Sequence, residues 1–247
     1  MKPAFKLSSQ GTGTEYHIYV ATPKESSTPA TPAESWRTIL FMDGDDQFAA
    51  AVEAYQELRK ADAVPPLLLV GVGYDASYMK PGNRRGRDYT PTFHSDEPSS
   101  GGAAAFLRFL QMELWPELAR RYPVRADERG IGGHSLGSLL VLDALLQEPP
   151  FFSRFLASAP SIWWDNRSVL QLVGARHARN PRVDGRLYLS VGGKDSASMT
   201  SDLKLLEEDL STSPFSGLTT VTQRFPKRNH FNVIPDAFRA GLKALYG

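Results

Sequence analysis

The chain of 247 residues contains no cysteine. Disulfide bridges, thiolate nucleophiles, zinc–thiolate sites and iron–sulfur clusters are therefore excluded, and covalent catalysis would need serine, threonine, lysine or a carboxylate. Long hydrophobic runs are also missing. The best apolar stretch, 64–72, is interrupted by prolines and a glycine and falls short of the ~18 residues that a spanning helix needs. The N-terminal residues show no signal-peptide pattern, so we expect a soluble, cytoplasmic protein without membrane contact.

Charge of one sign is not in excess either. Lysine and arginine number 28 and aspartate and glutamate 27, a formal net charge of +1. No global field is available to hold nucleic acid or an anionic membrane, and any charge selectivity must be local. With 41% hydrophobic and 22% charged residues, the composition is that of a globular protein. We expect a single domain over residues 1–247, a small-molecule partner, and a monomer or homodimer.

What the chain does contain is a regular alternation of strand and helix patterns. Buried strand patterns occur at 38–42, 67–72, 129–132, 155–158, 186–191 and 219–225, and helical patterns at 48–61, 103–121, 136–147, 168–178, 202–210 and 234–246. This alternation predicts an α/β fold with a mostly parallel central sheet and helices on both faces. An alternating segment at 15–20 predicts an antiparallel N-terminal edge, and 23–35 reads as a surface connection.

One connection, 73–101, is too long to serve only as a link. It contains several tyrosines and the basic group Arg84, Arg85 and Arg87. Its position after a parallel strand places it at the carboxyl edge, where open sheets bind ligands, and we interpret it as an ordered substrate-side loop. A solvated surface insertion is the alternative.

The strongest chemical signal is Gly-His-Ser-Leu-Gly at 133–137. A short strand rich in glycine precedes it and an apolar helical run follows, which is the context of a nucleophile elbow. Ser135 is therefore the candidate nucleophile, and the N–H of Leu136 a candidate oxyanion donor. His134, the variable position of the motif, is a candidate substrate contact.

A serine nucleophile needs a base. Among five histidines, His230 follows the last predicted strand and precedes the last helix, where this type of fold delivers its base. The other four are His17, His94, His134 and His177. Asp195, after the strand 186–191 and a glycine pair, is the candidate orienting acid. Asp165 and Asp202, the latter expected to cap a helix, compete with it, and Lys194 could instead make Asp195 part of a surface ion pair.

The turn after the strand 38–42 should supply the second oxyanion donor. Gly44 would permit the turn, and the N–H of Asp45 or Asp46 would face the substrate carbonyl. The aspartates here also invite a metal site, but their spacing does not match hard-cation loops. We expect no metal and no cofactor.

At these residues the sequence resembles the esterase D-like branch of the α/β-hydrolases, and within it the group of siderophore trilactone esterases. The stretches that carry the resemblance are 42–45, 87–91, 133–137, 159–164 (Ala-Pro-Ser-Ile-Trp-Trp), 192–195 and 229–231. The resemblance implies an α/β-hydrolase fold. It also implies that Trp163 and Trp164 line the substrate pocket, for which core packing is the equal alternative, and that Arg84 and Arg85 contact an anionic substrate. Because Arg87 is adjacent to Asp88, we expect these two residues to form a structural ion pair instead.

The main hypothesis is a cofactor-independent serine hydrolase of carboxylic esters that forms an acyl-enzyme on Ser135. A siderophore trilactone esterase, an acyltransferase with the same triad, and a catalytically silent binding protein on a hydrolase scaffold are the alternatives.

Overall fold

The computed structural model of the protein describes residues 1–23 and 35–247, and within these ranges eight strands form one sheet. The strands are β1 (Phe5–Ser8), β2 (Glu15–Ala21), β3 (Trp36–Phe41), β4 (Leu67–Gly73), β5 (Val124–His134), β6 (Arg154–Ser158), β7 (Arg182–Gly192) and β8 (Ser216–Phe225). Their order is β1-β2-β4-β3-β5-β6-β7-β8. The pairs from β4 to β8 are parallel, whereas β1 and β2 pair antiparallel at the edge. The expected parallel sheet with an antiparallel N-terminal edge is confirmed.

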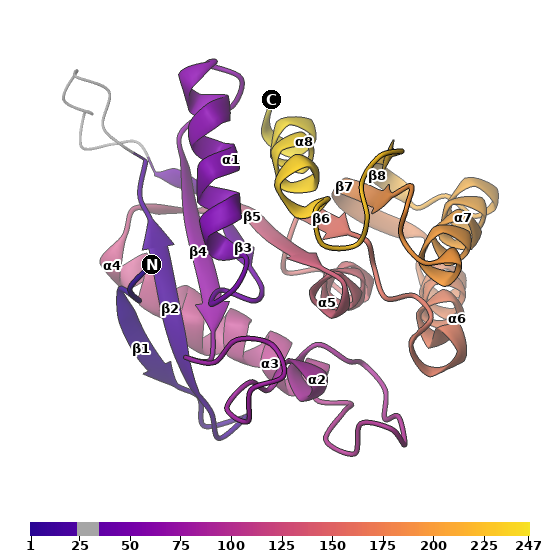
Figure 1. Cartoon of the computed structure of the whole chain (residues 1–247), viewed down its shortest axis with the longest axis horizontal. Coiled ribbons are helices and arrows are strands. Elements are labelled where there is room, and N and C mark those ends of the chain that lie inside the picture. Colours follow the sequence, from indigo (N-terminus) through magenta and orange to yellow (C-terminus); the bar gives the residue numbers. More distant parts are fainter. Residues whose placement is uncertain (24–34) are drawn as a thin grey trace.

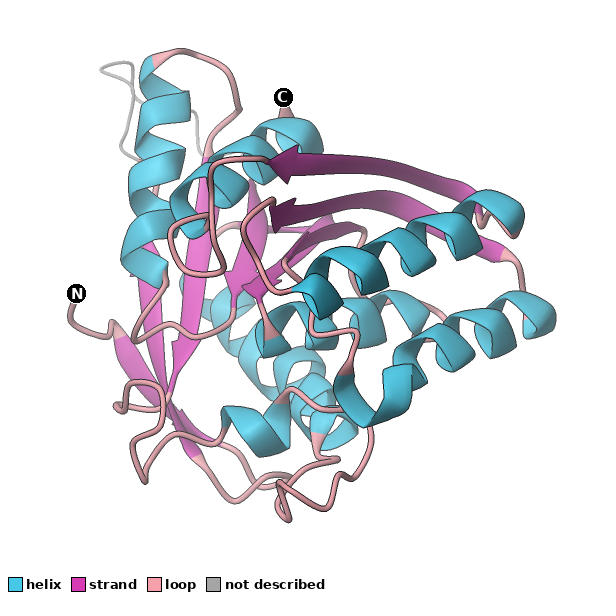
Figure 2. Cartoon of the chain, turned by 45° about the vertical axis from the view of Figure 1, so that its right-hand side comes forward, coloured by secondary structure: helices cyan, strands magenta, loops and turns pink. Residues whose placement is uncertain are grey.

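Helices cover both faces of the sheet (Figures 1 and 2). On one face α1 (Phe48–Lys60) and α8 (Ile234–Tyr246) pack side by side over a core that includes Phe41, Tyr55 and Phe238. On the other face lie α3 (Ala103–Phe109), α4 (Trp115–Arg121), α5 (Leu136–Leu146), α6 (Trp164–Arg179) and α7 (Ala197–Thr212). None of the helices in the described ranges is long and apolar enough to cross a membrane.

The burial of each helix follows from its sequence. Helix α5 is apolar around almost its whole circumference, and it lies between the sheet and α6. Helix α8 has one apolar face, which it turns to the sheet. Gly241 in α8 allows a close approach, because a Cβ there would lie 2.7 Å from Leu156 of β6. The sequence pattern of α5 therefore already marks it as the central helix.

Three elements differ from the sequence predictions. The helix expected at 103–121 is divided by a π-helical turn, η1 (Leu110–Leu114), before α4. Pro116 has no N–H for the usual bond to the fourth preceding carbonyl, and the wider turn accommodates this. Helix α6 includes Trp164, earlier than expected, but residues 165–167 have positive φ angles, so the regular right-handed helix begins at Ser168, where it was expected. Helix α7 begins at Ala197 with Ser196 as its cap, so Asp202 is not a cap but lies inside the helix. The connection 23–35 falls mostly outside the described residues.

The loop 73–101 is ordered and contains the short helix α2 (Arg85–Asp88). It follows β4 at the carboxyl edge of the parallel strands, the same edge at which β3, β5, β7 and β8 end. This common edge brings together the turn after Phe41, the elbow after His134, and the loops after Gly192 and Phe225.

Candidate active site

Ser135 lies on a sharp turn between β5 and α5, with φ +60° and ψ −121°. Residues other than glycine rarely adopt this backbone conformation. A strained serine at a strand-to-helix turn is characteristic of a nucleophile elbow. A Cβ placed on Gly133 would lie 2.5 Å from the carbonyl carbon of Gly137. Gly133 is therefore required by backbone contact, and the predicted strand–turn–helix context is confirmed.

Hydrogen bonds from the neighbouring strand β6 hold the elbow. Ser135 donates its N–H to the carbonyl of Ser158 over 3.0 Å, and Ser138 Oγ lies 2.7 Å from the same oxygen and 2.7 Å from that of Gly133. The Ser135 Oγ itself lies 3.3 Å from the Oγ of buried Ser161. Ser161 was not among the residues that sequence reasoning selected for the site. Its position in the matching stretch 159–164 was the available signal.

His230 and Asp195 come from the loops after β8 and β7. His230 Nδ1 lies 2.8 Å from Asp195 Oδ2, whose side chain is only 3% exposed. The two loops are bound to each other, because Lys194 donates its N–H to the carbonyl of Arg228 and Gly193 to that of Phe225. Gly192 permits this approach, since a Cβ there would lie 2.5 Å from the Arg228 oxygen. Asp195 thus pairs with His230, and within the described residues it forms no ion pair with Lys194.

The competing carboxylates lie elsewhere. Asp202 is buried in α7, and its Oδ1 accepts a hydrogen bond from Arg167 Nε over 2.8 Å. Asp165 is in the first turn of α6, where residues 165–167 have positive φ angles. Neither contacts His230 in the described structure.

The His134 side chain is buried and packs against the ring of His230, so it is not open to a substrate. Its ring centroid lies 4.5 Å from that of His230, and its Nδ1 lies 3.0 Å from Ser158 Oγ. Burial, followed by the charge of His230, lowers the pKa of His134 well below its ordinary value. The expectation that His134 contacts substrate is not supported by this placement, because strand β5 directs the residue before the nucleophile inward.

The turn after β3 lies where the sequence predicted it. Two of its three candidate oxyanion donors, however, already donate their N–H groups to carbonyls of the protein. Gly44 donates its N–H to the carbonyl of Val72 over 2.8 Å, and Asp46 donates to that of Asp43 over 3.1 Å. The N–H of Asp45 has no acceptor among the described residues. This leaves Asp45 and Leu136 as the candidate oxyanion donors from the predicted set.

The aspartate side chains of this turn bind separate protein partners. Asp43 pairs with Arg85, Asp45 accepts hydrogen bonds from the hydroxyl of Tyr19 and the N–H of Tyr74, and Asp46 accepts one from the N–H of Tyr78. Their carboxylates therefore fasten the loop 73–101 to the turn.

The arginines of the long loop divide into three environments. Arg87 Nε lies 2.7 Å from Asp88 Oδ1, the structural ion pair that was expected. Arg85 forms a two-point pair with buried Asp43, at 2.9 and 3.1 Å. Burial raises the pKa of the Asp43 carboxyl and Arg85 acts against that rise. Arg84 is exposed. The charge of Arg85 is thus neutralised within the protein, contrary to its expected use on an anionic substrate.

The tryptophan pair is divided between the two expected roles. Trp163 is 44% exposed and lines a cleft with Ser135 and His230. Trp164 is buried and donates its Nε1–H to the carbonyl of Thr92 over 3.3 Å. Position 163 therefore belongs to the pocket wall and position 164 to the core.

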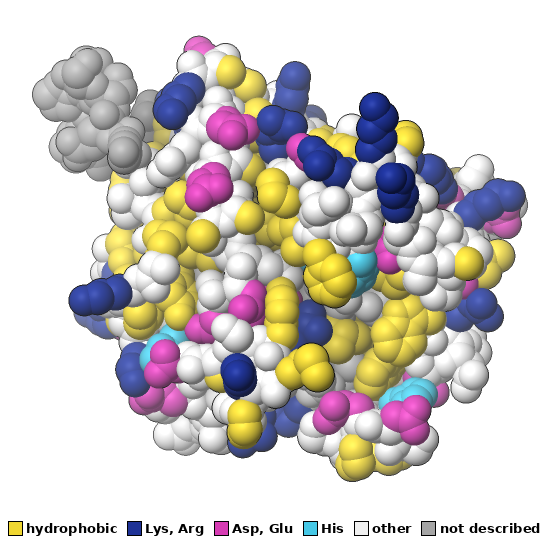
Figure 3. All heavy atoms as spheres, viewed as in Figure 1, with side chains coloured by type: hydrophobic (Ala, Val, Ile, Leu, Met, Phe, Trp, Pro, Cys, Tyr) yellow, Lys and Arg dark blue, Asp and Glu magenta, His cyan; other side chains and the backbone are white. Residues whose placement is uncertain are grey.

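The cleft at Ser135 is open and has a volume of ≈ 460 Å³. Its other lining residues are Lys194, Asp195, Ser196, Met199, Asn229 and Phe231. Phe231 is 74% exposed and stands beside the His230 ring. Hydrophobic side chains reach the surface across the middle of the face in Figure 3, and most lysines and arginines seen there stand along its margin.

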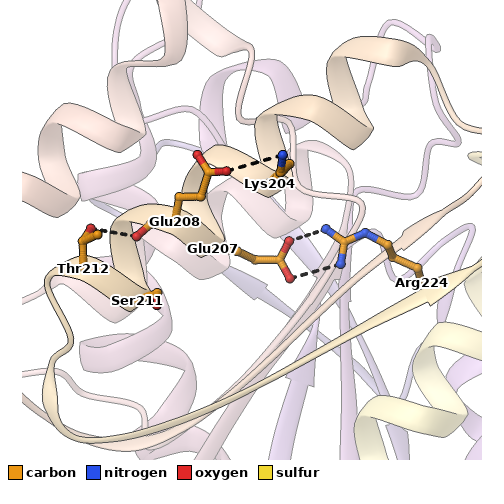
Figure 4. Close-up of a pocket in the computed structure, with 6 residues that line it drawn as sticks. All are labelled: Lys204, Glu207, Glu208, Ser211, Thr212 and Arg224. Carbon is orange, nitrogen blue, oxygen red and sulfur yellow. Dashed lines mark hydrogen bonds and ion pairs between the residues drawn. The ribbon is translucent and has the colours of Figure 1, made fainter.

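A second hollow, of ≈ 640 Å³, lies between α7 and β8 (Figure 4). Its charges satisfy one another: Glu207 pairs with Arg224, and Glu208 with Lys204 over 3.6 Å. It holds a serine, Ser211, but no histidine lines it. Of these two hollows, the cleft at Ser135 is the one in which a nucleophile and a base occur together.

A strained serine at an elbow, a histidine–aspartate pair on adjacent loops, and a strand order with an antiparallel edge define a serine hydrolase of the α/β-hydrolase fold. The chain belongs to the family described as "Putative esterase", whose model matches residues 9–222. It is 30% identical over 249 residues to the ferri-bacillibactin esterase BesA of Bacillus subtilis, covering 93% of this chain and 84% of that one. It is 25% identical over 250 residues to the apo-salmochelin esterase of Escherichia coli, covering 94% of this chain and 75% of that one.

Among solved structures, the BES protein from Bacillus cereus is similar to this chain with a TM-score of 0.87 and 27% identity, covering 98% of this chain and 94% of that one. The protein is thus an esterase, and the expected hydrolase class is confirmed.

Proposed function

We propose that Ser135, His230 and Asp195 form the catalytic triad. Ser135 Oγ attacks the ester carbonyl carbon while His230 accepts the hydroxyl proton. The carbonyl oxygen becomes an oxyanion that the N–H of Leu136 and that of Asp45 stabilise. The tetrahedral intermediate then releases the alcohol, which takes the proton from His230 and leaves an acyl group on Ser135. Water attacks the acyl-enzyme with His230 again as base, so that the acid is released and the serine is restored.

We infer that Asp195 orients His230 and stabilises its protonated form. The 2.8 Å contact at Nδ1 supports this role, because it assigns the proton of the neutral ring to Nδ1 and leaves Nε2 as the basic nitrogen. The open cleft favours hydrolysis over acyl transfer to another acceptor, since water has access to an acyl-enzyme there.

We further propose that the substrate is a siderophore ester, in particular the triester ring of a trilactone siderophore. The observation that carries this proposal is the similarity to the ferri-bacillibactin esterase along 93% of the chain. Trp163 and Phe231 provide aromatic surface at the cleft, which suits aryl groups, and Lys194 provides an exposed cation for anionic ones. These residues, rather than Arg85, are the candidates for substrate contact, and Arg84 remains a candidate at the margin.

The test is a comparison of kcat/KM for a tricatecholate trilactone, with and without bound Fe(III), against p-nitrophenyl butyrate. A siderophore esterase is expected to prefer the trilactone by at least about 100-fold. A preference for the short ester would contradict the substrate assignment while leaving the esterase class intact. Fractionation and size-exclusion chromatography test the two remaining expectations, a cytoplasmic location and a monomer or homodimer.

A further inference from the structure

The turn 42–47, which joins β3 to α1, lies directly against the first turn of α5. A Cβ placed on Gly137 would lie 3.2 Å from the Met42 Cβ and 3.4 Å from Asp43 Oδ2. Met42 also donates its N–H to the carbonyl of Gly132 in β5 over 2.9 Å. The turn and the elbow are therefore in van der Waals contact, and a displacement of one requires a displacement of the other.

Asp43 holds this turn in an unusual conformation. Its φ is +54°, in the left-handed region that residues other than glycine rarely adopt, and it is almost completely buried. Its carbonyl accepts the N–H groups of Asp46 and Gln47, and its own N–H donates to the Tyr89 hydroxyl over 3.0 Å. These hydrogen bonds and the burial of Asp43 hold the turn in this conformation.

Arg85 supplies the strongest of these constraints. Its Nε lies 2.9 Å from Asp43 Oδ1 and its Nη2 lies 3.1 Å from Oδ2, so that the planar guanidinium matches the carboxylate at two points. The guanidinium also packs 4.8 Å from the ring centroid of Tyr78. Because a buried carboxylate is costly without a paired cation, removal of Arg85 would leave Asp43 unable to keep its place as an anion.

The short helix that carries Arg85 is itself anchored at its other end. Asp88, fully buried, binds Arg87 Nε and accepts hydrogen bonds from the hydroxyls of Tyr16, over 2.8 Å, and Tyr74, over 3.1 Å. Helix α2 is thereby bound to β2 on one side and to the turn 42–47 on the other. These contacts of Asp88 therefore fix the position of α2, from which Arg85 extends to Asp43.

We propose that Arg85 is a positioning residue for the esterase reaction: through the Asp43 carboxylate it fixes the turn 42–47 against the elbow and keeps the oxyanion donors aligned with the ester carbonyl. The inference rests on the proposed roles of Ser135, Leu136 and Asp45. Oxyanion donors bind the transition state more strongly than the bound substrate, so their misalignment lowers kcat and leaves KM nearly unchanged.

The experiment uses p-nitrophenyl butyrate, a short and uncharged ester that offers nothing for a cation to bind. Arg85→Ala is expected to lower kcat about 10- to 100-fold with KM within about twofold of wild type. Arg85→Lys keeps the charge but lacks the two-point fork, and it should recover only part of kcat. Added methylguanidinium at millimolar concentration should raise kcat of Arg85→Ala, whereas methylammonium at equal ionic strength should not.

Arg154→Ala is the matched control, because it also removes a partly buried arginine from its carboxylate partner, Glu128, but at the start of β6, the opposite edge of the sheet from Ser135. It should lower the melting temperature and leave kcat within about twofold, whereas a purely structural Arg85 would behave in the same way as Arg154. If Arg85→Ala does not fold, the double variant Asp43→Asn/Arg85→Ala removes both buried charges. It should fold and still show the kcat loss.

Wild-type kcat in folded Arg85→Ala or in the double variant, a change confined to KM, or a kcat loss that methylguanidinium does not reduce would each overturn the proposal. These outcomes are independent of the siderophore assignment, since the ester is generic. Failure of the triad proposal would appear separately, as turnover of this ester by Ser135→Ala.

Discussion

His230 Nδ1 and Asp195 Oδ2 lie 2.8 Å apart although the two residues are 35 positions apart in the chain. The contact depends on hydrogen bonds that join the loops after β7 and β8. One of these is the bond from the backbone N–H of Lys194 to the Arg228 carbonyl, over 2.8 Å. Asp195 is nearly buried, so its charge acts on His230 with little screening by solvent.

This contact leads to the first prediction. Asp195→Asn should lower kcat for p-nitrophenyl butyrate by about 10³–10⁴-fold, because an amide favours the wrong ring tautomer and does not stabilise the imidazolium. Steady-state kinetics near pH 8 measure the loss. Asp202→Asn, at the competing carboxylate, is the control and should affect stability more than turnover. A loss of kcat in Asp202→Asn as large as that in Asp195→Asn would contradict the assignment.

The strained backbone at Ser135 gives a second prediction. Ser135→Ala and Ser135→Gly should both abolish turnover and labelling by a fluorophosphonate probe. Glycine relieves the positive φ of +60° and alanine does not, so Ser135→Gly should be more stable than Ser135→Ala by about 1 kcal/mol after the entropy of the unfolded chain is counted. Urea unfolding of the two variants measures the difference. Equal stabilities would mean that the elbow is not strained.

The two tryptophans should respond in opposite ways. Trp164→Ala removes a buried ring and should reduce the free energy of unfolding by about 3–5 kcal/mol. Trp163→Ala removes a half-exposed ring at the cleft and should change that free energy by less than about 1 kcal/mol, while raising KM for an aryl ester several-fold. Denaturant unfolding and KM for both variants are the measurements. An unchanged KM in Trp163→Ala would remove Trp163 from the substrate contacts.

Asp143 of α5 predicts a specific pH dependence of stability. Burial raises the pKa of its carboxyl to about 6, and no cation pairs with it in the described structure. The folded protein therefore binds this proton more strongly than the unfolded chain, and stability falls as the pH rises from about 4 to about 6. Asp143→Asn should raise the free energy of unfolding by about 1–2 kcal/mol at pH 7.5 and change it little at pH 4. A stabilisation that is equal at both pH values would contradict this origin.

Much of this protein was predictable from local sequence patterns. The alternation of apolar strands with helical segments predicts the parallel sheet, because each strand must bury both faces. The glycines at 133 and 137 predict the elbow, and in the structure a Cβ on Gly133 would lie only 2.5 Å from the carbonyl carbon of Gly137. His230 and Asp195 followed from their places after successive strands, which end at the same edge of the sheet.

Other features depend on contacts between distant segments, which local patterns do not encode. Arg84, Arg85 and Arg87 are similar in sequence, yet one is exposed, one binds Asp43 and one binds Asp88. Trp163 and Trp164 are adjacent, yet one lines the cleft and one is buried. From the sequence, the N–H groups of Gly44, Asp45 and Asp46 are equivalent candidate oxyanion donors. In the structure, Gly44 donates its N–H to the Val72 carbonyl and Asp46 donates its N–H to the Asp43 carbonyl.

The sequence by itself therefore determined the fold class and the identity and order of the triad candidates, because these follow from hydrophobic periodicity and from residue types at strand ends. Only the tertiary structure decided which charges are available to a substrate. A buried carboxylate such as Asp43 must be paired with a cation, and the identity of that cation depends on which loop packs against it. At Asp43 that cation is Arg85, which the loop 73–101 brings to within 2.9 Å of the carboxylate.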